Sequence, residues 1–168
     1  QLKQSIINTA VTRGLDKSVP MKDSGVEWIG DVPAHWGFKR LKDAVDLRYS
    51  NVDKLSQEGE VPVVLCNYVD VYKNDFIDAS LPFMAATANA TEIKRFSLRK
   101  HDVLVTKDSE TADDIAVSAL VLDTLPGVLC GYHLAQLRGK PGVMHGPYLF
   151  RLFQSDNYGH RFATHAKG

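Results

Sequence analysis

The sequence has 168 residues, of which 44% are hydrophobic and 24% are charged, and its formal net charge at pH 7 is +0. This composition is ordinary for a globular protein, and the length suits one domain with its own core and room for an appended helix. No apolar run reaches the roughly 18 residues of a membrane-spanning helix, which excludes a membrane protein of that kind, and the balanced charge gives no overall argument for a nucleic-acid partner.

The N-terminus and the cysteines bear on cellular location. The opening "QLKQSIINTA" lacks the basic start and apolar centre of a signal peptide, and its first residue, Gln1, suggests a piece of a longer chain. Cys66 and Cys130 lie in apolar stretches, which indicates buried free thiols in a reducing cytoplasm. A disulfide between them is the alternative, because pairing is not readable from sequence. We therefore expect a cytoplasmic protein.

Residues 2–13 have the pattern of a helix. Leu2, Ile6, Ile7 and Val11 fall on one face at helical spacing, and Gly14 stands where a C-terminal cap belongs. A narrow apolar stripe on so short a helix must be covered. The cover is either the rest of this domain or a helix outside this chain.

Residues 15–25 have the composition of a linker, with Pro20, Gly25 and several charges. The segment that follows carries both tryptophans, Trp28 and Trp36, on either side of a Gly-Asp-Val-Pro turn. Two indoles at this spacing indicate anchors at the edge of a core, and a binding role is the alternative. Next, 38–41 predicts a short strand and 42–49 a short helix.

From residue 61 the pattern becomes that of strands. Runs of apolar or alternating residues predict strands over 61–66, 68–72, 102–106, 114–122 and 127–139, with turns at 73–75 and 123–127. Helical spacing returns from Tyr148 to Ala166, with Pro147 in the first turn. These elements predict an α+β fold, in which a mixed or antiparallel sheet has peripheral helices. The predicted organisation is a helix end over 1–14, a linker over 15–25 and a domain over 26–168.

Charge is unevenly distributed along the chain. Between 102 and 123 six acids accompany the single base Lys107, whereas between 138 and 168 five bases accompany the single acid Asp156. A second basic group runs from Lys94 to Lys100. Local groups of this kind could form a DNA-binding face, and an evenly solvated surface is the alternative.

The stretch "VTKDSET" (105–111) places a Lys, two acids and three hydroxyls directly after an apolar strand. The sequence contains no G-x-S-x-G elbow, no P-loop and no G-x-G-x-x-G, and no second pair joins Cys130 and His133 to complete a zinc site. A metal-dependent nuclease using Asp108, Glu110 and Lys107 lacks its usual acid-x-Lys order. Catalysis is therefore the weaker hypothesis. A loop that contacts phosphates or base edges and a solvated turn remain as alternatives.

Several stretches together resemble one known family. "MKDSGVEWIGDVPAHWGFKRLKDAV" (21–45) is similar to the opening of a target recognition domain in type I restriction–modification specificity subunits, which has a Trp-Ile/Leu-Gly-x-Ile/Val-Pro-x-His-Trp segment and then a basic residue before Leu. Here this segment runs from Trp28 to Trp36, followed by Arg40-Leu41. "DVLVTKDSET" and "VLCGYHLAQLR" resemble central strands of that family. "QSIINTAVTRGLD" is similar to the end of its spacer helix, an order that implies the second recognition domain.

The resemblance implies a non-catalytic role. Such a subunit reads a bipartite DNA target with two recognition domains, one for each half. Long spacer helices hold the domains apart and dock methyltransferase (M) subunits, and a restriction and translocase (R) subunit cuts unmodified DNA. S-adenosylmethionine, ATP and Mg²⁺ are then expected in the partner subunits and no cofactor in this chain. Residues 26–168 would be the DNA target recognition domain.

We expect double-stranded DNA to be contacted by polar side chains near the ends of strands. Lys107 suits a phosphate or a guanine edge, and Arg99 and Lys100 suit phosphates. The full candidate set is Lys107, Ser109, Thr111, Tyr72, Lys73, Asn74, Arg99, Lys100, Tyr132 and His133. The alternative from another class is a protein-interaction module that docks through the stripe Leu2, Ile6 and Val11, and the nuclease remains a third, weaker hypothesis.

Overall fold

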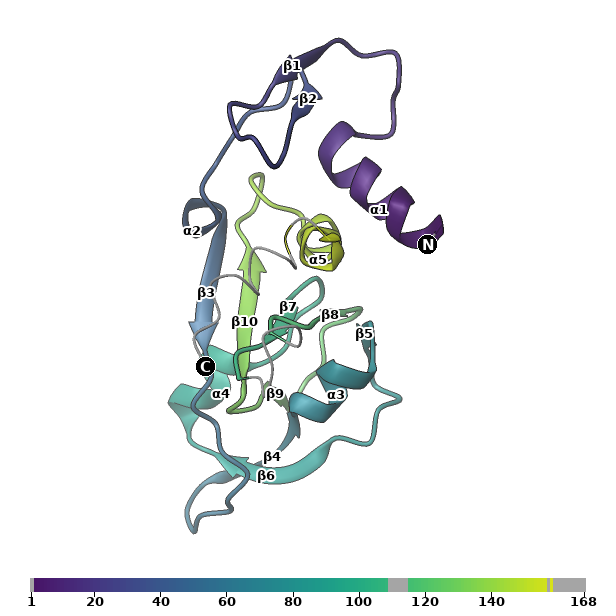
Figure 1. The fold of residues 1–168 in the computed structure, drawn as a ribbon. Coiled ribbons are helices and arrows are strands. Elements are labelled where there is room, and N and C mark those ends of the chain that lie inside the picture. The colour runs from purple at the N-terminus through teal and green to yellow at the C-terminus, as the bar shows by residue number, and fades with distance from the viewer. Residues whose placement is uncertain (1, 109–114, 157, 159–168) are drawn as a thin grey trace.

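The computed structural model describes residues 2–108, 115–156 and 158, and it combines helices with three sheets (Figure 1). Helix α1 (Leu2–Arg13) and a two-stranded sheet of β1 (Met21–Asp23) and β2 (Asp31–Pro33) precede a larger body. No helix within these described ranges is both long and apolar enough to cross a membrane.

The central element of the body is a five-stranded sheet. Its order is β3-β10-β7-β8-β5, and every neighbouring pair is antiparallel except β5 and β8. The strands are β3 (Val45–Tyr49), β10 (Leu134–Gly139), β7 (Val103–Thr106), β8 (Ser118–Val121) and β5 (Phe76–Ile77). The mixed pairing and the surrounding helices confirm the predicted α+β class.

All four residues of β7 are buried, because both faces of the sheet are covered. Successive side chains of a strand point to opposite faces. Val103 and Val105 accordingly pack with Leu149 and Phe150 of helix α5 (Gly146–Gln154), whereas Leu104 packs in the cluster on the other face.

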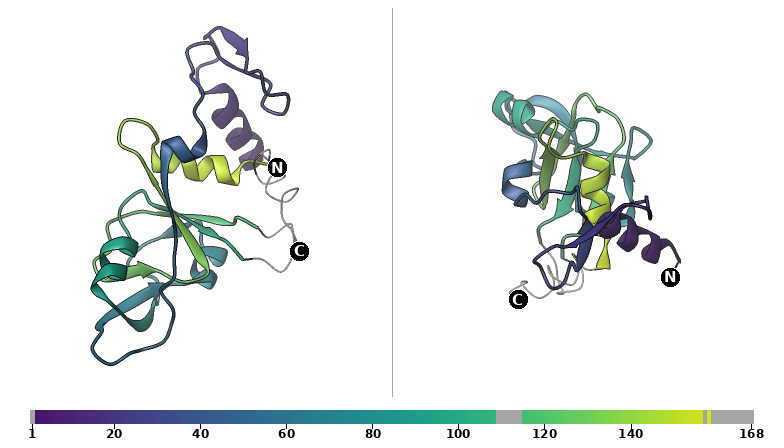
Figure 2. Two further views of the ribbon diagram at one scale, coloured as in Figure 1. Left: turned by 90° about the vertical axis from the view of Figure 1, so that its left-hand side faces the viewer. Right: turned by 90° about the horizontal axis from the view of Figure 1, so that it is seen from above.

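The other face of the central sheet is covered by a second layer. It contains a three-stranded sheet of order β6-β4-β9, together with two short helices. These elements are β6 (Met84–Ala88), β4 (Val61–Cys66), β9 (Val128–Cys130), α3 (Tyr68–Lys73) and α4 (Ala90–Phe96). Figures 1 and 2 place this layer at the end of the molecule that lies away from α1. Leu65, Phe96 and Leu129 form its fully buried centre.

Helix α1 packs against α5. Its buried residues Ile7 and Val11 form a small cluster with Leu152 of α5, and the Tyr148 hydroxyl donates a hydrogen bond to the Val11 carbonyl at 3.1 Å. The helix ends at Arg13 and is followed by Gly14, whose φ of 74° suits glycine and whose N–H donates to the carbonyl of Ala10. The predicted helix over 2–13 is thus confirmed.

Both tryptophans act as anchors between the N-terminal segment and the C-terminal helical region. Trp28 makes an edge-to-face contact with Tyr158 at a centroid distance of 5.1 Å, and Trp36 makes one with Tyr148 at 6.5 Å. Both contacts favour the anchoring interpretation of these residues over a binding role.

The prediction of a strand over 68–72 is wrong, because this segment is helix α3. Asn67 caps the helix, and the Asp70 carboxylate accepts the Asn67 N–H at 2.7 Å, which completes a capping box. Local hydrogen bonding of this kind outweighs an alternating apolar pattern over five residues.

Four further segments differ from the predictions. Residues 127–139 form two strands, β9 and β10, rather than one, and Met21–Asp23 within the predicted linker forms β1. The predicted strand over 38–41 is absent. The predicted helix over 42–49 is instead divided between α2 (Leu41–Ala44) and β3. Strand β3 forms because it pairs with β10, a tertiary contact that local sequence does not encode. The helical pattern beyond 158 lies outside the described residues, and the domain limits at 14 and 25 stay predictions.

A buried polar cluster ties β7 to β10. The Asp102 carboxylate, which is fully buried, accepts two hydrogen bonds from Arg138 at 2.7 Å and one from the Gln136 amide at 2.8 Å. It also accepts the Arg99 N–H at 2.8 Å, and Arg138 reaches the Ser97 carbonyl. These hydrogen bonds hold the Arg138 guanidinium inside the protein, so it does not contribute to a basic surface.

We predict that Asp102→Ala destabilises the fold by about 3 kcal/mol or more, because it leaves the Arg138 charge and the Gln136 amide without their carboxylate partner. Asp43→Ala is the matched control. It removes an exposed ion pair with Arg40 and is expected to cost less than about 1 kcal/mol. Urea unfolding of both variants measures the difference, and equal unfolding free energies would show that the cluster does not hold the sheet.

Candidate functional site

The candidate site lies at the end of the central sheet where β7 stops and β10 begins. Thr106 pairs with Leu134 across these strands, so Lys107 follows one strand directly and His133 precedes the other. The Lys107 N–H donates to the His133 carbonyl at 3.2 Å, which joins the two segments beyond the last strand pair. Tyr132 and His133 therefore lie in the turn between β9 and β10, and their predicted placement on a strand is wrong.

The side chain of Lys107 is held in place at this end. Its Nζ donates to the Ser50 carbonyl at 3.2 Å and lies 4.4 Å from the centroid of the Tyr132 ring. The first contact links the end of β7 to the residue after β3, and the second is a cation–π interaction. An ammonium has three donors, so these contacts leave capacity for an anion or a base edge.

His133 pairs with Asp108. Its Nδ1 lies 2.7 Å from the Asp108 carboxylate, and both side chains are more than half exposed, at 58% and 56%. The ring of Tyr132 contacts that of His133 edge to face at 4.9 Å. Asp108 thus orients His133, whereas Lys107 is held by Ser50 and Tyr132. We name the four residues Lys107, Asp108, Tyr132 and His133 the sheet-end cluster.

A close backbone approach fixes the turn that carries Tyr132 and His133. The Gly131 N–H donates to the Cys66 carbonyl at 2.9 Å, and a Cβ at Gly131 would lie 2.7 Å from the side-chain oxygen of Asn67. Glycine is therefore required where β9 ends beside the start of α3. The "CGYH" stretch contains the signal for this turn, which the strand prediction overlooked.

Ser50 and Asp108 are site residues that the predicted contact set omits. The Ser50 hydroxyl is buried and donates to the Cys130 carbonyl at 2.6 Å, so the carbonyl that receives Lys107 is itself fixed. No local pattern around Ser50 signals this role, because the contact joins residues 80 apart in the sequence.

The other candidates are divided between two further places. Tyr72 and Lys73 lie in the last turn of α3, where Tyr72 stacks on Tyr68 at 5.5 Å, and Asn74 caps the helix by donating to the Asp70 carbonyl. They are not on the turn between strands that the sequence predicted.

Arg99 and Lys100 lie at the opposite end of β7 from Lys107. The four residues of β7 separate the two positions by about 13 Å of extended chain. Lys100 forms an exposed ion pair with Asp123 at 3.2 Å. The structure therefore does not bring this basic pair together with Lys107. Ser109 and Thr111 lie outside the described residues.

The thiols of Cys66 and Cys130 are buried and unreactive at neutral pH. Cys66 and Cys130 are register partners on the parallel strands β4 and β9, both are buried, and both are free. Burial raises the pKa of each thiol well above its ordinary value, so both stay protonated at neutral pH.

Within residues 2–108, 115–156 and 158 the structure contains no group of three His, Cys, Asp or Glu residues arranged to hold a metal ion.

Comparison with known proteins bears on the fold. No protein-family model and no curated protein matches this sequence. The crystal structure of the HsdS subunit from Thermoanaerobacter tengcongensis matches 97% of this chain with a TM-score of 0.56 and 12% sequence identity. A structure concerned with complex assembly and conformational transition of the type I R-M system matches 91% of the chain with a TM-score of 0.50, also at 12% identity. The chain covers 35% and 34% of the two matched chains, and it has the fold of the matched third of the HsdS subunit from Thermoanaerobacter tengcongensis.

Proposed function

We propose that this chain is a DNA target recognition domain of a type I restriction–modification specificity subunit and that it reads one half of a bipartite target. The observation that carries the proposal is the fold match over 97% of the chain, which includes the N-terminal helix as well as the sheets. The segment from Trp28 to Trp36 supports it independently, because it has the sequence pattern that opens such domains.

The sheet-end cluster suits the reading of DNA. It presents a cation, an imidazole and an exposed aromatic ring on a backbone fixed by buried strands, and Tyr132 is 49% exposed. Rigid placement of donors and acceptors favours affinity, because little conformational entropy is lost on binding, and fixed positions let them distinguish one base edge from another. The net charge of +0 is compatible with this role, because other subunits can supply much of the phosphate contact.

The proposed role is non-catalytic. Methyltransferase subunits with S-adenosylmethionine would modify the DNA, and a restriction and translocase subunit that uses ATP and Mg²⁺ would cut it, all in the cytoplasm. This chain would contribute the choice of sequence and the positioning of those partners.

Domain exchange tests this proposal. We predict that replacing residues 26–168 in a complete specificity subunit by the corresponding segment of a subunit with another target changes one half of the methylated motif and leaves the other half unchanged. Mapping methylated adenines in genomic DNA reads out both halves at once. An unchanged motif in an active complex would refute the assignment.

A single substitution tests which end of the sheet meets DNA. We predict that Lys107→Ala weakens binding of the assembled enzyme or its discrimination by about 1–3 kcal/mol, because it removes a positioned cation. Lys100→Ala, at the other end of β7, is the comparison and is expected to have a smaller effect. Binding to target and non-target duplexes measures both, and a larger loss for Lys100→Ala would place DNA at the other end.

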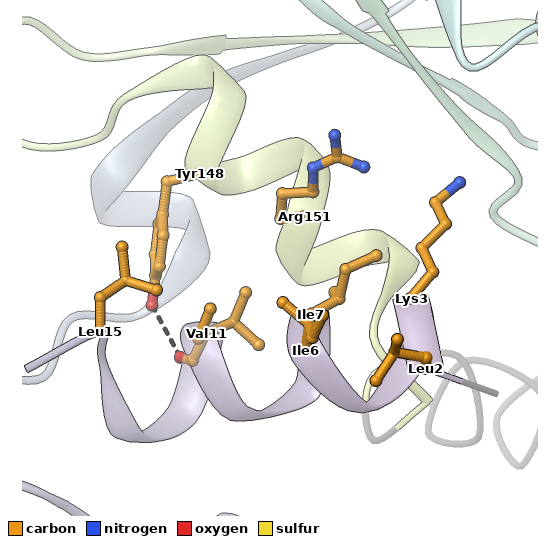
Figure 3. A pocket seen from close by; sticks show the side chains of 9 residues that line it. Leu2, Lys3, Ile6, Ile7, Val11, Leu15, Tyr148 and Arg151 are labelled. Carbon is orange, nitrogen blue, oxygen red and sulfur yellow. Dashed lines mark hydrogen bonds between the residues drawn. The ribbon is translucent and has the colours of Figure 1, made fainter. Parts of the chain in front are cut away.

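The N-terminal helix supports a second, compatible role in protein interaction. Leu2, Ile6 and Leu15 are 76%, 57% and 86% exposed, and they line an open apolar groove between α1 and α5 (Figure 3). Ile7 and Val11, by contrast, are buried against α5. The apolar stripe is thus only partly covered by its own domain. We propose that its exposed part contacts the methyltransferase subunits.

We predict that the double substitution Leu2→Ser and Ile6→Ser weakens assembly of the complete subunit with the methyltransferase about tenfold or more and leaves the unfolding midpoint unchanged, because both side chains are exposed within the domain. Leu55→Ser is the control, since Leu55 is 62% exposed elsewhere on the surface. Analytical ultracentrifugation measures assembly. If the double variant assembles as tightly as the control, the helix does not dock through this face.

A further inference from the structure

We propose that His133 reads one base pair as a hydrogen-bond acceptor and that Asp108 is the positioning residue that makes it one. This inference rests on the proposed DNA-reading function and assigns a base class to one side chain of the sheet-end cluster.

The direction of the hydrogen bond between Asp108 and His133 determines which nitrogen of the His133 ring can act as an acceptor. The Asp108 carboxylate lies 2.7 Å from Nδ1 of His133. An ionised carboxylate only accepts hydrogen bonds, so Nδ1 must hold the proton. In the neutral imidazole the remaining nitrogen, Nε2, is then an acceptor. Without Asp108 the ring would be free to exchange tautomers and present a donor instead.

The surroundings of His133 keep its ring in a defined place. Tyr132 contacts it edge to face at 4.9 Å, and the ring of Tyr132 is in turn held under the Lys107 ammonium. The main chain is also fixed, because the His133 carbonyl accepts the Lys107 N–H. The side chain nevertheless stays 58% exposed, which leaves it accessible to a partner.

An acceptor at this position selects a class of base. In the major groove of DNA, adenine and cytosine present an exocyclic amino group as a donor, whereas guanine N7 and O6 and thymine O4 are acceptors. Nε2 of neutral His133 can therefore accept from adenine N6 or cytosine N4, and it meets only acceptors on guanine or thymine. A phosphate also offers only acceptors, so this tautomer does not suit a backbone contact.

The experiment uses the complete enzyme and the target found by methylation mapping. Binding is measured on a set of duplexes in which each base pair of the half-site read by this domain is replaced in turn. We expect His133→Ala to reduce about fivefold or more the discrimination at one base pair between adenine or cytosine and guanine or thymine on the contacted strand, and to leave the other positions unchanged.

The role of Asp108 is tested on the same duplexes. Asp108→Ala is expected to reduce discrimination at that same base pair and to add nothing when His133 is already Ala. Asp108→Asn keeps an oxygen that can accept from Nδ1 and should retain part of the discrimination. Asp123→Ala, which removes an exposed carboxylate paired with Lys100, is the control and should change nothing. Unfolding midpoints of all variants verify that they fold.

Three results would overturn the inference. One is unchanged discrimination in His133→Ala, the second is an equal loss on every duplex, as a phosphate contact would give, and the third is an effect of Asp108→Ala that persists without His133. Each of these leaves the recognition assignment intact if domain exchange still changes the methylated half-site. An exchange without effect would instead refute the assignment itself.

Discussion

The structure depends on the burial of strands β7 and β10 on both faces. Helix α5 covers one face and the three-stranded sheet with its helices covers the other, so alternate side chains of these strands belong to two different cores. The Asp102 carboxylate, directly before β7, is buried as well, and Arg138 and Gln136 of β10 donate hydrogen bonds to it. Two apolar faces and one ionic clamp fix the register of the two strands, since a shift by one residue would exchange the two cores.

The burial of β7 and β10 on both faces limits where their polar side chains can contact a partner. Central strands with no free face can present polar side chains to a partner only beyond their ends. At one end β7 is followed by Lys107 and Asp108, and β10 is preceded by Tyr132 and His133. These four residues are connected by contacts of their own and rest on Gly131 and Ser50, which are packed against the second layer. A frame of this kind allows the exposed residues to change while the buried strands remain.

The sequence predicted the parts of this structure that follow from local pattern. The N-terminal helix, the strands at 61–66 and 102–106 and the first part of the C-terminal helical pattern, with Pro147 near its start and its end at Gln154, are found. The failures have two physical causes. In the segment 68–72, a capping box stabilises a helix despite the alternating pattern. In the segment 127–139, the predicted single strand is interrupted at Gly131, because the chain there lies close to Asn67. The candidate site was predicted in part: Lys107, Tyr132 and His133 meet, but Arg99 lies at the other end of the strand. The predicted strand over 102–106 already separates Arg99 from Lys107, whereas the meeting of Lys107 with His133 depends on the pairing of β7 with β10, which local pattern does not encode.

The central claim is that DNA meets the end of the sheet defined by Lys107, Asp108, Tyr132 and His133. Hydrogen–deuterium exchange of the complete enzyme, with and without a duplex that carries its target, tests this claim most directly. We expect slower exchange of backbone amides in residues 105–108 and 131–134 when the target is bound, and little change in residues 97–101 at the opposite end. Slower exchange confined to residues 97–101, or none in either segment, would contradict the account.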